Sequence, residues 1–292
     1  MKESTYCSYK FAIEKHLIPD LGDINLYDIQ NFEFNDYLKK KKKRLQRSKY
    51  NIDDDELRID INSIIIKLKG ILKFFNRKYK DFKIDLELIN RQKEDNCEIE
   101  VFSEKEKNKL SKYLMQSDRL KDLGILIGLY SGLRIGEVCG LKWEDFDFDN
   151  KLIYVQRTVQ RIYLGKGVSK LTVTPPKTEK SKRKVPISRA INEKLKILSK
   201  PYSKDSYILT GNAKKFTEPL TYRYVYKNVL KMCNIPYKKF HCLRHTFATR
   251  CIRVWMDIKS LSEVLGHSSI GITLDIYVHS SYEVKKKYID RL

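Results

Sequence analysis

The chain has 292 residues, of which 41% are hydrophobic and 33% charged, and its formal net charge is +22. This apolar content is enough for packed cores and excludes a disordered basic tail. The longest uncharged apolar run, residues 123–133, is far shorter than the roughly 20 residues of a membrane span, and no signal-peptide segment opens the chain. The six cysteines include no C-x-x-C pair, so we expect reduced thiols in a cytoplasmic protein that has no membrane partner.

Residues 1–80 predict a small helical domain. Helices are expected over residues 4–16 and 26–43, and a third is marked by apolar positions that share one helical face, which are Ile61, Ile64, Ile65, Leu68, Leu72 and Phe75. Residues 81–100 lose this periodicity and gain charge, which is typical of a linker.

A lysine-rich run lies between the second and third expected helices. Lys39–Arg44 has the sequence KKKKKR, and Asp53–Glu56 cancels its charge a few residues later. Such runs are typical of solvated connections, so residues 39–56 are predicted to be exposed. The lysines predicted to contact nucleic-acid phosphates are Lys39, Lys41 and Lys43.

A second domain is expected over residues 101–292. Ser103 and Glu106 have the spacing of a capping box, which predicts that a helix begins there. Residues 123–130 are apolar on every face, as in a buried helix, and Gly132 is placed to end that helix.

Short β-rich runs follow this buried helix. Residues 152–159, 171–174 and 184–187 predict a small antiparallel sheet, and helical patterns resume at Ala190 and continue through most of the remaining chain. The predicted fold class is therefore mainly α with a small antiparallel β-sheet.

The excess positive charge is concentrated in one stretch of the chain. Residues 1–99 have 21 basic and 18 acidic side chains, whereas residues 151–253 have 25 basic side chains and only four acidic ones. A field of one sign this large attracts a polyanion. We therefore expect nucleic acid as the partner, bound through its phosphates.

Candidate catalytic side chains are concentrated near the C-terminus. Four of the five histidines lie in the last 52 residues. His241 and Arg244 are three residues apart, so an imidazole and a guanidinium share one helical face and can bind one anionic ligand. Arg134 follows the end of the buried helix, and His267 lies in a glycine-containing turn ten residues before Tyr277.

In this order the motifs resemble those of the tyrosine recombinases, the phage-type integrases. The family's elements match G-L-R-x-x-E at residues 132–137, H-x-L-R-H at residues 241–245, and L-G-H followed by a tyrosine at residues 265–277. The resemblance covers almost the whole chain and is strongest to integrases of conjugative transposons and temperate phages. It implies a helical core-site DNA-binding domain followed by a catalytic domain. The catalytic residues that it implies are Arg134, His241, Arg244 and His267 around the phosphate, with Tyr277 as the nucleophile.

These residue types suit the cleavage of a phosphodiester. The guanidiniums of Arg134 and Arg244 can give bidentate hydrogen bonds to non-bridging oxygens, on which negative charge develops in the transition state. The phenol of Tyr277 is a poor nucleophile until it loses its proton, which His241 can accept. Religation of a 3′-phosphotyrosine needs neither ATP nor metal, so no cofactor and no metal site are expected.

A general acid is also required for the leaving 5′-oxygen, and the family uses a lysine on a β-hairpin. Residues 176–186, PKTEKSKRKVP, are similar to the family's strand pair. Lys177 is the match, and Lys180, Lys182 and Lys184 remain alternatives that spacing does not separate. The predicted DNA contacts in this run are Lys180, Lys182 and Arg183.

Two further residues near these motifs are expected to have structural roles. Glu137, one turn after Arg134, is predicted to orient the structure through an ion pair. His245 is predicted to pack or hydrogen-bond in the pocket wall.

Other functions share parts of this pattern. A metal-dependent nuclease is suggested by the alternating Asp145, Asp147 and Asp149, but the run lacks the glycine and glutamate of a calcium loop and is more simply a turn. His241 and His245 lack the glutamate of an H-E-x-x-H zinc motif. A non-catalytic DNA-binding regulator would need only the basic field, and a type IB topoisomerase shares the chemistry but differs in size and motif sequence.

The resemblance also implies partners. They are double-stranded DNA, a homo-tetramer on two DNA sites that is linked through the tail after Tyr277, and an excisionase or DNA-bending accessory protein. Integrases of this type often have an earlier arm-binding domain, whereas this chain begins almost within the first core-binding helix, so either that domain has been removed or the protein recognises simple sites.

Overall fold

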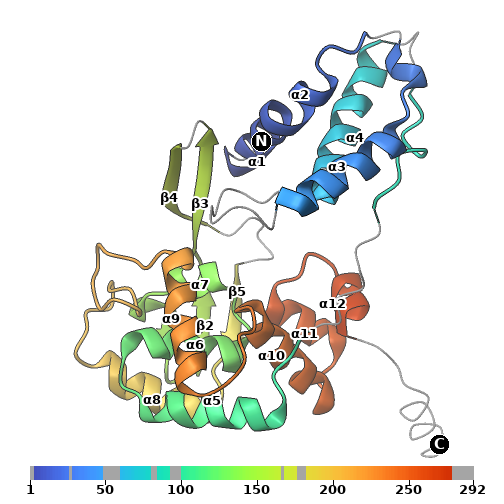
Figure 1. Ribbon diagram of the computed structural model, residues 1–292. Helices are drawn as coiled ribbons and strands as arrows, with labels where there is room; N and C mark the ends of the chain where they lie inside the picture. Colours follow the sequence, from blue (N-terminus) through green and yellow to red (C-terminus); the bar gives the residue numbers. More distant parts are fainter. Residues whose placement is uncertain are drawn as a thin grey trace, which may run out of the picture. The chain divides into compact units, whose positions relative to one another are not determined.

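The computed structural model describes residues 3–25, 28–48, 60–79, 84–92, 100–165, 168–175 and 182–277. Its contacts divide the chain into two compact units (Figure 1). The first unit comprises residues 1–97 together with 162–170, and the second comprises residues 98–161 and 171–292.

Within the described part of residues 1–97, every regular element of the first unit is a helix or a helical turn. Its elements are α1 (Glu3–Ala12), the π-helical turn η1 (Ile13–Leu17), α2 (Ile18–Leu21), the 3₁₀ turn η2 (Asp28–Asn31), α3 (Phe34–Ser48) and α4 (Ile61–Lys78). Asp60 begins α4, because its carboxylate accepts hydrogen bonds from the backbone N–H groups of Asn62 and Ser63. Leu38, Ile64 and Ile65 are fully buried in the core of this unit.

Two predictions for this unit were wrong at their boundaries. The second helix was expected from residue 26, but a 3₁₀ turn comes first and α3 begins at Phe34. The expected exposed connection over residues 39–56 is helical as far as Ser48, because α3 has an apolar face that continues through Leu38 and Leu45 onto the core.

In the second unit, both helix signals at its start are confirmed. Ser103 accepts a hydrogen bond from the N–H of Glu106, whose carboxylate accepts one from the N–H of Ser103, and α5 (Glu104–Gln116) begins there. The next helix, α6 (Leu120–Ser131), is buried on nearly every face and ends at Gly132, which has φ +65°. It is followed by α7 (Ile135–Gly140).

The strands form two small sheets. β1 (Phe146–Asp147), β2 (Leu152–Val155) and β5 (Arg183–Pro186) form an antiparallel sheet in the order β1-β2-β5, in which Ile153 is opposite Val185. β3 (Thr158–Gly165) and β4 (Val168–Thr174) form a separate two-stranded sheet. The predicted single strand over residues 152–159 was wrong, because the chain leaves the sheet at Arg157, whose guanidinium reaches Asp145 at 2.8 Å.

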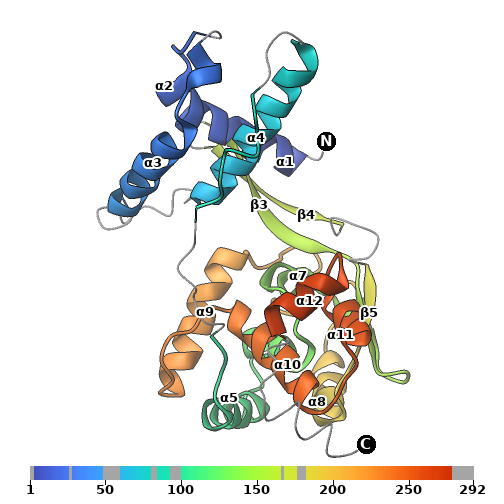
Figure 2. The ribbon, with the colours of Figure 1, turned by 90° about the vertical axis from the view of Figure 1, so that its right-hand side faces the viewer.

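The remaining elements of the second unit are the 3₁₀ turn η3 (Trp143–Asp145) and the helices α8 (Arg189–Ser199), α9 (Pro219–Met232), α10 (His241–Arg253), α11 (Ile258–Leu265) and α12 (Ile270–Tyr277). Both views show α10, α11 and α12 lying together, and Figure 2 shows α11 next to β5. The core helix α6 packs on α10. This packing brings the turn after α6, the start of β5, the start of α10 and the turn after α11 into one region.

The predicted fold class, mainly α with small antiparallel sheet structure, is confirmed. Across the described residues, no helix combines the length and the apolar character needed to cross a bilayer.

Candidate active site

Arg134 is held in the turn between α6 and α7. Gly132 allows this turn, because its φ of +65° disfavours other residues and a Cβ there would lie 2.6 Å from Phe247. The carboxylate of Glu137 accepts hydrogen bonds from both the backbone N–H and the Nη1 of Arg134, each at 2.9 Å, so the predicted ion pair is confirmed. Arg134 Nη2 donates to the carbonyl of Gly266 at 3.1 Å. The side chain of Arg134 remains 37% exposed, so solvent and ligands can reach its guanidinium.

Arg244 is the largest fully buried side chain in the described part of the protein. Its Nη1 donates to the carbonyl of Gly132 at 3.0 Å, and its Nη2 donates to the carbonyl of Leu265 at 2.7 Å. These carbonyls lie at the C-terminal ends of α6 and α11, where helix dipoles place partial negative charge. The two helix ends therefore stabilise the buried guanidinium of Arg244. Without such partners, the burial of its charge would cost a large free energy.

His241 and His245 lie one turn apart at the start of α10. Their rings meet edge to face with centroids 4.5 Å apart. Although His241 is partly exposed to solvent, burial of its ring, followed by the charges of His245, Arg244 and Arg134, lowers its pKa to about 4. Burial and then Arg244 also lower the pKa of His245. His241 is therefore uncharged at neutral pH and has a lone pair that can accept a proton.

His267 lies in the turn between α11 and α12. Its Nδ1 is 2.8 Å from the hydroxyl of Thr273, a fully buried residue of α12. Burial, followed by the charges of Arg244 and Arg134, lowers the pKa of His267 to about 4. The contact with Thr273 fixes the orientation of the ring and connects it to the helix that ends at Tyr277.

The structure thus brings together four of the six residues predicted to be catalytic. The charges of Arg134 and Arg244 act on both His241 and His267, although these residues come from three separate segments. Tyr277 is the last residue of α12, and its side chain is outside the described part of the chain. Lys177 is also outside the described residues.

The predicted DNA contacts have different environments. Lys39 and Lys43 are exposed on α3, and Lys39 forms an ion pair with Asp36 at 3.3 Å. Lys182 is also exposed. Lys180 lies outside the described residues.

Two of the residues predicted to contact DNA are buried in ion pairs. Lys41 is 8% exposed, because its Nζ lies 2.6 Å from the Asp20 carboxylate and also donates to the carbonyl of His16. The side chain of Arg183 is 5% exposed and binds the Glu137 carboxylate. Both cations are thus paired within the protein.

The structural roles of Arg183 and Thr273 were not predicted from the sequence. Arg183 has a signal, because alternate residues of a strand share a face and the next inward position, Val185, is buried. Thr273 has no comparable signal, since its contact with His267 depends on how α12 folds back.

The acidic run at residues 145–149 was expected to form a turn, but Asp145 ends η3, Asp147 ends β1, and only Asp149 lies in a turn. Asp145 is buried and accepts hydrogen bonds from the N–H of Lys142 and from Arg157, each at 2.8 Å. Asp147 accepts a hydrogen bond from the N–H of Asn150 at 2.9 Å. Within the described ranges, no three His, Cys, Asp or Glu residues are grouped as a metal site would require.

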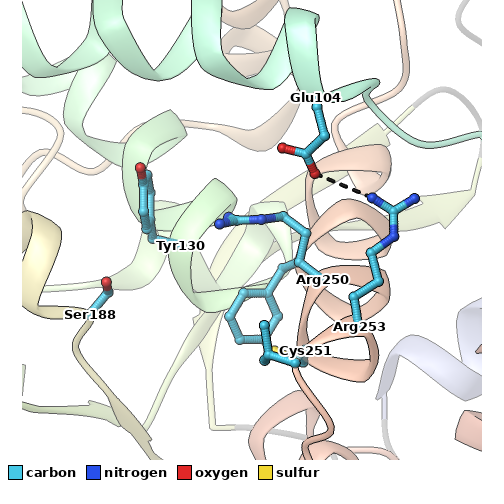
Figure 3. Close-up of a pocket in the computed structure, with 8 residues that line it drawn as sticks. Glu104, Tyr130, Ser188, Arg250, Cys251 and Arg253 are labelled. Carbon is cyan, nitrogen blue, oxygen red and sulfur yellow. Dashed lines mark hydrogen bonds and ion pairs between the residues drawn. The ribbon is translucent and has the colours of Figure 1, made fainter.

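A separate pocket of about 360 Å³ lies between α5, α6 and α10. Figure 3 shows Arg250 extending toward Tyr130 and Arg253 paired with Glu104. Cys251 also lines this pocket, but burial raises the pKa of its thiol to about 11, so the thiol is protonated at neutral pH. None of the predicted catalytic residues lines this pocket.

Comparisons with known proteins identify the family of this chain. Residues 98–284 match the phage integrase family, and residues 1–42 match the N-terminal SAM-like domain of phage integrases. A tyrosine recombinase XerC-like protein of Caldanaerobacter subterraneus is 36% identical over an alignment of 214 residues, and the match covers 67% of this chain and 54% of that protein. The transposase of transposon Tn916 from Enterococcus faecalis is 30% identical over an alignment of 184 residues, and the match covers 58% of this chain and 44% of the transposase. The matches thus span about half the length of these two relatives.

The fold has solved counterparts. A structure of the Tn1549 transposon integrase in complex with a circular intermediate DNA has a TM-score of 0.64 and 20% sequence identity, and the match covers 97% of this chain and 98% of that one. This chain therefore belongs to the phage integrase family of tyrosine recombinases, and the resemblance in its motifs is confirmed.

Proposed function

We propose that this protein is a site-specific recombinase that cleaves and rejoins double-stranded DNA to integrate or excise a mobile element. The observation that carries the proposal is the convergence of Arg134 and Arg244 with two uncharged imidazoles. Cations of this geometry suit the non-bridging oxygens of a phosphodiester. Relatives named as transposases, and an integrase solved with transposon DNA, support the choice of DNA as the substrate.

In the proposed reaction, the Tyr277 phenol oxygen attacks the phosphorus and its proton passes to His241. The bond from phosphorus to the 5′-oxygen breaks, and Lys177 donates a proton to that oxygen. The product is a 3′-phosphotyrosine and a free 5′-hydroxyl. Attack by a 5′-hydroxyl of another strand reverses these steps, so the phosphodiester is restored without ATP.

The charges of the pocket suit this sequence of steps. Without DNA, the guanidiniums and burial keep the pKa of His241 near 4, which makes it a weak base. A bound phosphate brings negative charge that opposes the guanidiniums, so the pKa of His241 rises when substrate is present. His267, whose ring is held by Thr273, would donate a hydrogen bond to the same phosphate.

The domain roles follow from the same proposal. Residues 1–80 would bind the core site, residues 81–100 would act as the linker, and residues 101–292 would form the catalytic domain. Lys39, Lys43, Lys180 and Lys182 would contact DNA phosphates. We further propose a homo-tetramer on two DNA sites, linked through residues 283–292, which lie outside the described residues, with an excisionase or DNA-bending protein as accessory factors, all in the cytoplasm.

Replacement of the nucleophile tests the function directly. Tyr277→Phe is expected to keep DNA affinity and to lose the covalent adduct, because only the phenol oxygen is removed. The DNA would be selected from random sequence by binding to the wild-type protein, then nicked near the cleavage point so that the adduct is trapped. Adduct formation should persist in excess EDTA, because side-chain cations perform the role that metal ions have in two-metal nucleases. A trapped Tyr277→Phe adduct, or cleavage that depends on magnesium, would contradict the proposal.

The assignment of Lys177 has its own test. General acid catalysis contributes roughly 10²–10⁴ in rate, and least when the leaving group is a good one. Lys177→Ala should therefore be slow on normal DNA and largely rescued on DNA with sulfur at the 5′-bridging position. Arg134→Ala and Arg244→Ala should be rescued much less.

The matched controls for this test are the same substitution at Lys180, Lys182 and Lys184. If one of these is rescued by sulfur while Lys177→Ala cuts normal DNA at the wild-type rate, the general acid is a different lysine.

A further inference from the structure

Arg183 is the first residue of β5 and has an almost completely buried side chain. Its Nη1 and Nη2 donate to the two carboxylate oxygens of Glu137, both at 3.0 Å, and its Nε donates to the carbonyl of Val264 at 2.6 Å. The side chains of Arg183 and Glu137 are only 5% and 6% exposed. This is the bidentate geometry in which a guanidinium binds a carboxylate most strongly.

The same carboxylate also holds Arg134. Glu137 accepts from the backbone N–H and the Nη1 of Arg134 in addition to Arg183. One carboxylate is therefore shared by a buried guanidinium behind it and a partly exposed guanidinium in front of it. Without Arg183, Arg134 would be the remaining described partner of the Glu137 carboxylate.

Arg183 also supports the turn that carries His267. Its Nε donates to the carbonyl of Val264, near the end of α11, and a Cβ at Gly266 would lie 3.0 Å from the Arg183 guanidinium. The carbonyl of Gly266 in turn accepts from Arg134. Arg183 thus contacts both segments whose relative position sets the Arg134 guanidinium.

We propose that Arg183 is a positioning residue of the proposed active site, which acts through Glu137 and the turn after α11 to hold the Arg134 guanidinium against the scissile phosphate. This assignment rests on the proposed function. Arg183 would then act in catalysis from a buried position, whereas the sequence predicts that it binds DNA at the surface. A lysine at this position would supply a charge but not the fork of donors.

The test compares cleavage of two DNAs by Arg183→Met. One is the selected, nicked DNA, and the other has a methylphosphonate at the scissile position, which lacks one anionic oxygen and so needs less from Arg134. On normal DNA we expect adduct formation to slow by about 10²-fold, as for a catalytic group misplaced by an ångström. On the methylphosphonate the loss should be at least tenfold smaller, in parallel with Arg134→Ala.

Arg157→Met is the matched control, because it breaks another ion pair of an arginine with a buried carboxylate in the same unit, that of Asp145. It should affect both DNAs by the same factor. If Arg183→Met folds poorly, the double variant Arg183→Met, Glu137→Met removes both buried charges of this pair together, while the more exposed Arg134 keeps the carbonyl of Gly266 and solvent as partners. It should show the same selective loss on normal DNA.

Two results would overturn the assignment. One is an equal loss on both DNAs for Arg183→Met or the double variant. The other is a fall of about one in the slope of log Kd against log salt concentration, which indicates a direct phosphate contact. Failure of the wild-type protein to form an adduct on any selected DNA would instead overturn the proposed function, and the assignment with it.

Discussion

The first and the second unit each contain a buried ion pair, and the two pairs differ in what they connect. In the first unit, Lys41 binds Asp20, and Tyr37 donates to the same carboxylate at 3.0 Å. Burial alone would raise the pKa of Asp20, but Lys41 and Tyr37 hold it below its ordinary value. Lys41 also donates to the carbonyl of His16 at 3.1 Å, so these bonds join α3 to the preceding helical turns.

In the second unit, the pair of Arg183 and Glu137 continues to Arg134, which is partly exposed. Both pairs withdraw from solvent a cation that the sequence predicts to bind DNA. The two pairs differ in the exposed guanidinium that each contacts: Arg44 lies 3.8 Å from the Asp20 carboxylate, whereas Arg134 binds Glu137 at 2.9 Å and lies among the predicted catalytic residues. Burial of a charge therefore does not by itself indicate function; the next group in the network does.

Glu137→Gln should have the largest effect on this comparison. The pKa of Glu137 is lowered to about 2: burial alone would raise it, but Arg183 and Arg134 favour its charged form. Relative to the ordinary value of 4.5, this shift corresponds to about 3 kcal/mol of stability. Because the folded pKa is the lower one, this stability is fully present above pH 4.5 and is lost as the pH falls toward 2. Urea unfolding should show wild type and variant differing by this amount at pH 7 and converging toward pH 2.

The same variant should also lose cleavage activity, because Arg134 loses its carboxylate partner. Adduct formation at pH 7 is the measurement. Equal cleavage rates for Glu137→Gln and wild type would show that Arg134 keeps its position without this carboxylate.

Lys41→Met should have a smaller and purely structural effect. We expect a loss of about 1–2 kcal/mol in the free energy of unfolding, because the buried Asp20 carboxylate loses one of its charged partners while Tyr37 remains. Cleavage at saturating DNA should be unchanged. The control is Lys41→Met with Asp20→Leu, which should recover much of the lost stability; a slower cleavage step in either variant would remove the distinction between the two pairs.

The smallest expected effects are on the salt dependence of DNA binding. Lys43 is exposed on α3, only two residues after Lys41. If it contacts a phosphate, Lys43→Gln should reduce the slope of log Kd against log salt concentration by about 0.9, whereas Lys41→Met should leave the slope unchanged. Fluorescence anisotropy at several salt concentrations measures both, and a reduced slope for Lys41→Met would show that its ion pair opens on DNA.

The features that sequence predicts correctly depend on local chemistry. The capping box at Ser103 and the helix end at Gly132 each involve residues within one turn, so their spacing carries the information. The catalytic motifs are equally local, although their convergence requires the whole fold. The break between β2 and β3 is not local, because it accompanies a contact between Arg157 and Asp145 twelve residues earlier.

The burial of Lys41 and Arg183, which were predicted to be exposed DNA contacts, has a common cause. Both cations occupy inward positions of regular elements, and these positions cannot be recognised from composition alone. Lys41 follows Leu38 by three residues and precedes Leu45 by four, which is the spacing of one helical face. The helical periodicity of apolar residues around the lysine run predicts that Lys41 is buried, whereas the charge of the run alone predicts that Lys41 is exposed.

The guanidiniums of Arg134 and Arg244 are held largely by main-chain carbonyls, those of Gly132, Leu265 and Gly266. A substitution can remove a side-chain acceptor, but every residue type has a carbonyl. This part of the pocket can therefore survive extensive sequence drift, provided that the backbone path is kept. The vulnerable positions are the two glycines, both at φ +65°, because a change there alters where the carbonyls point.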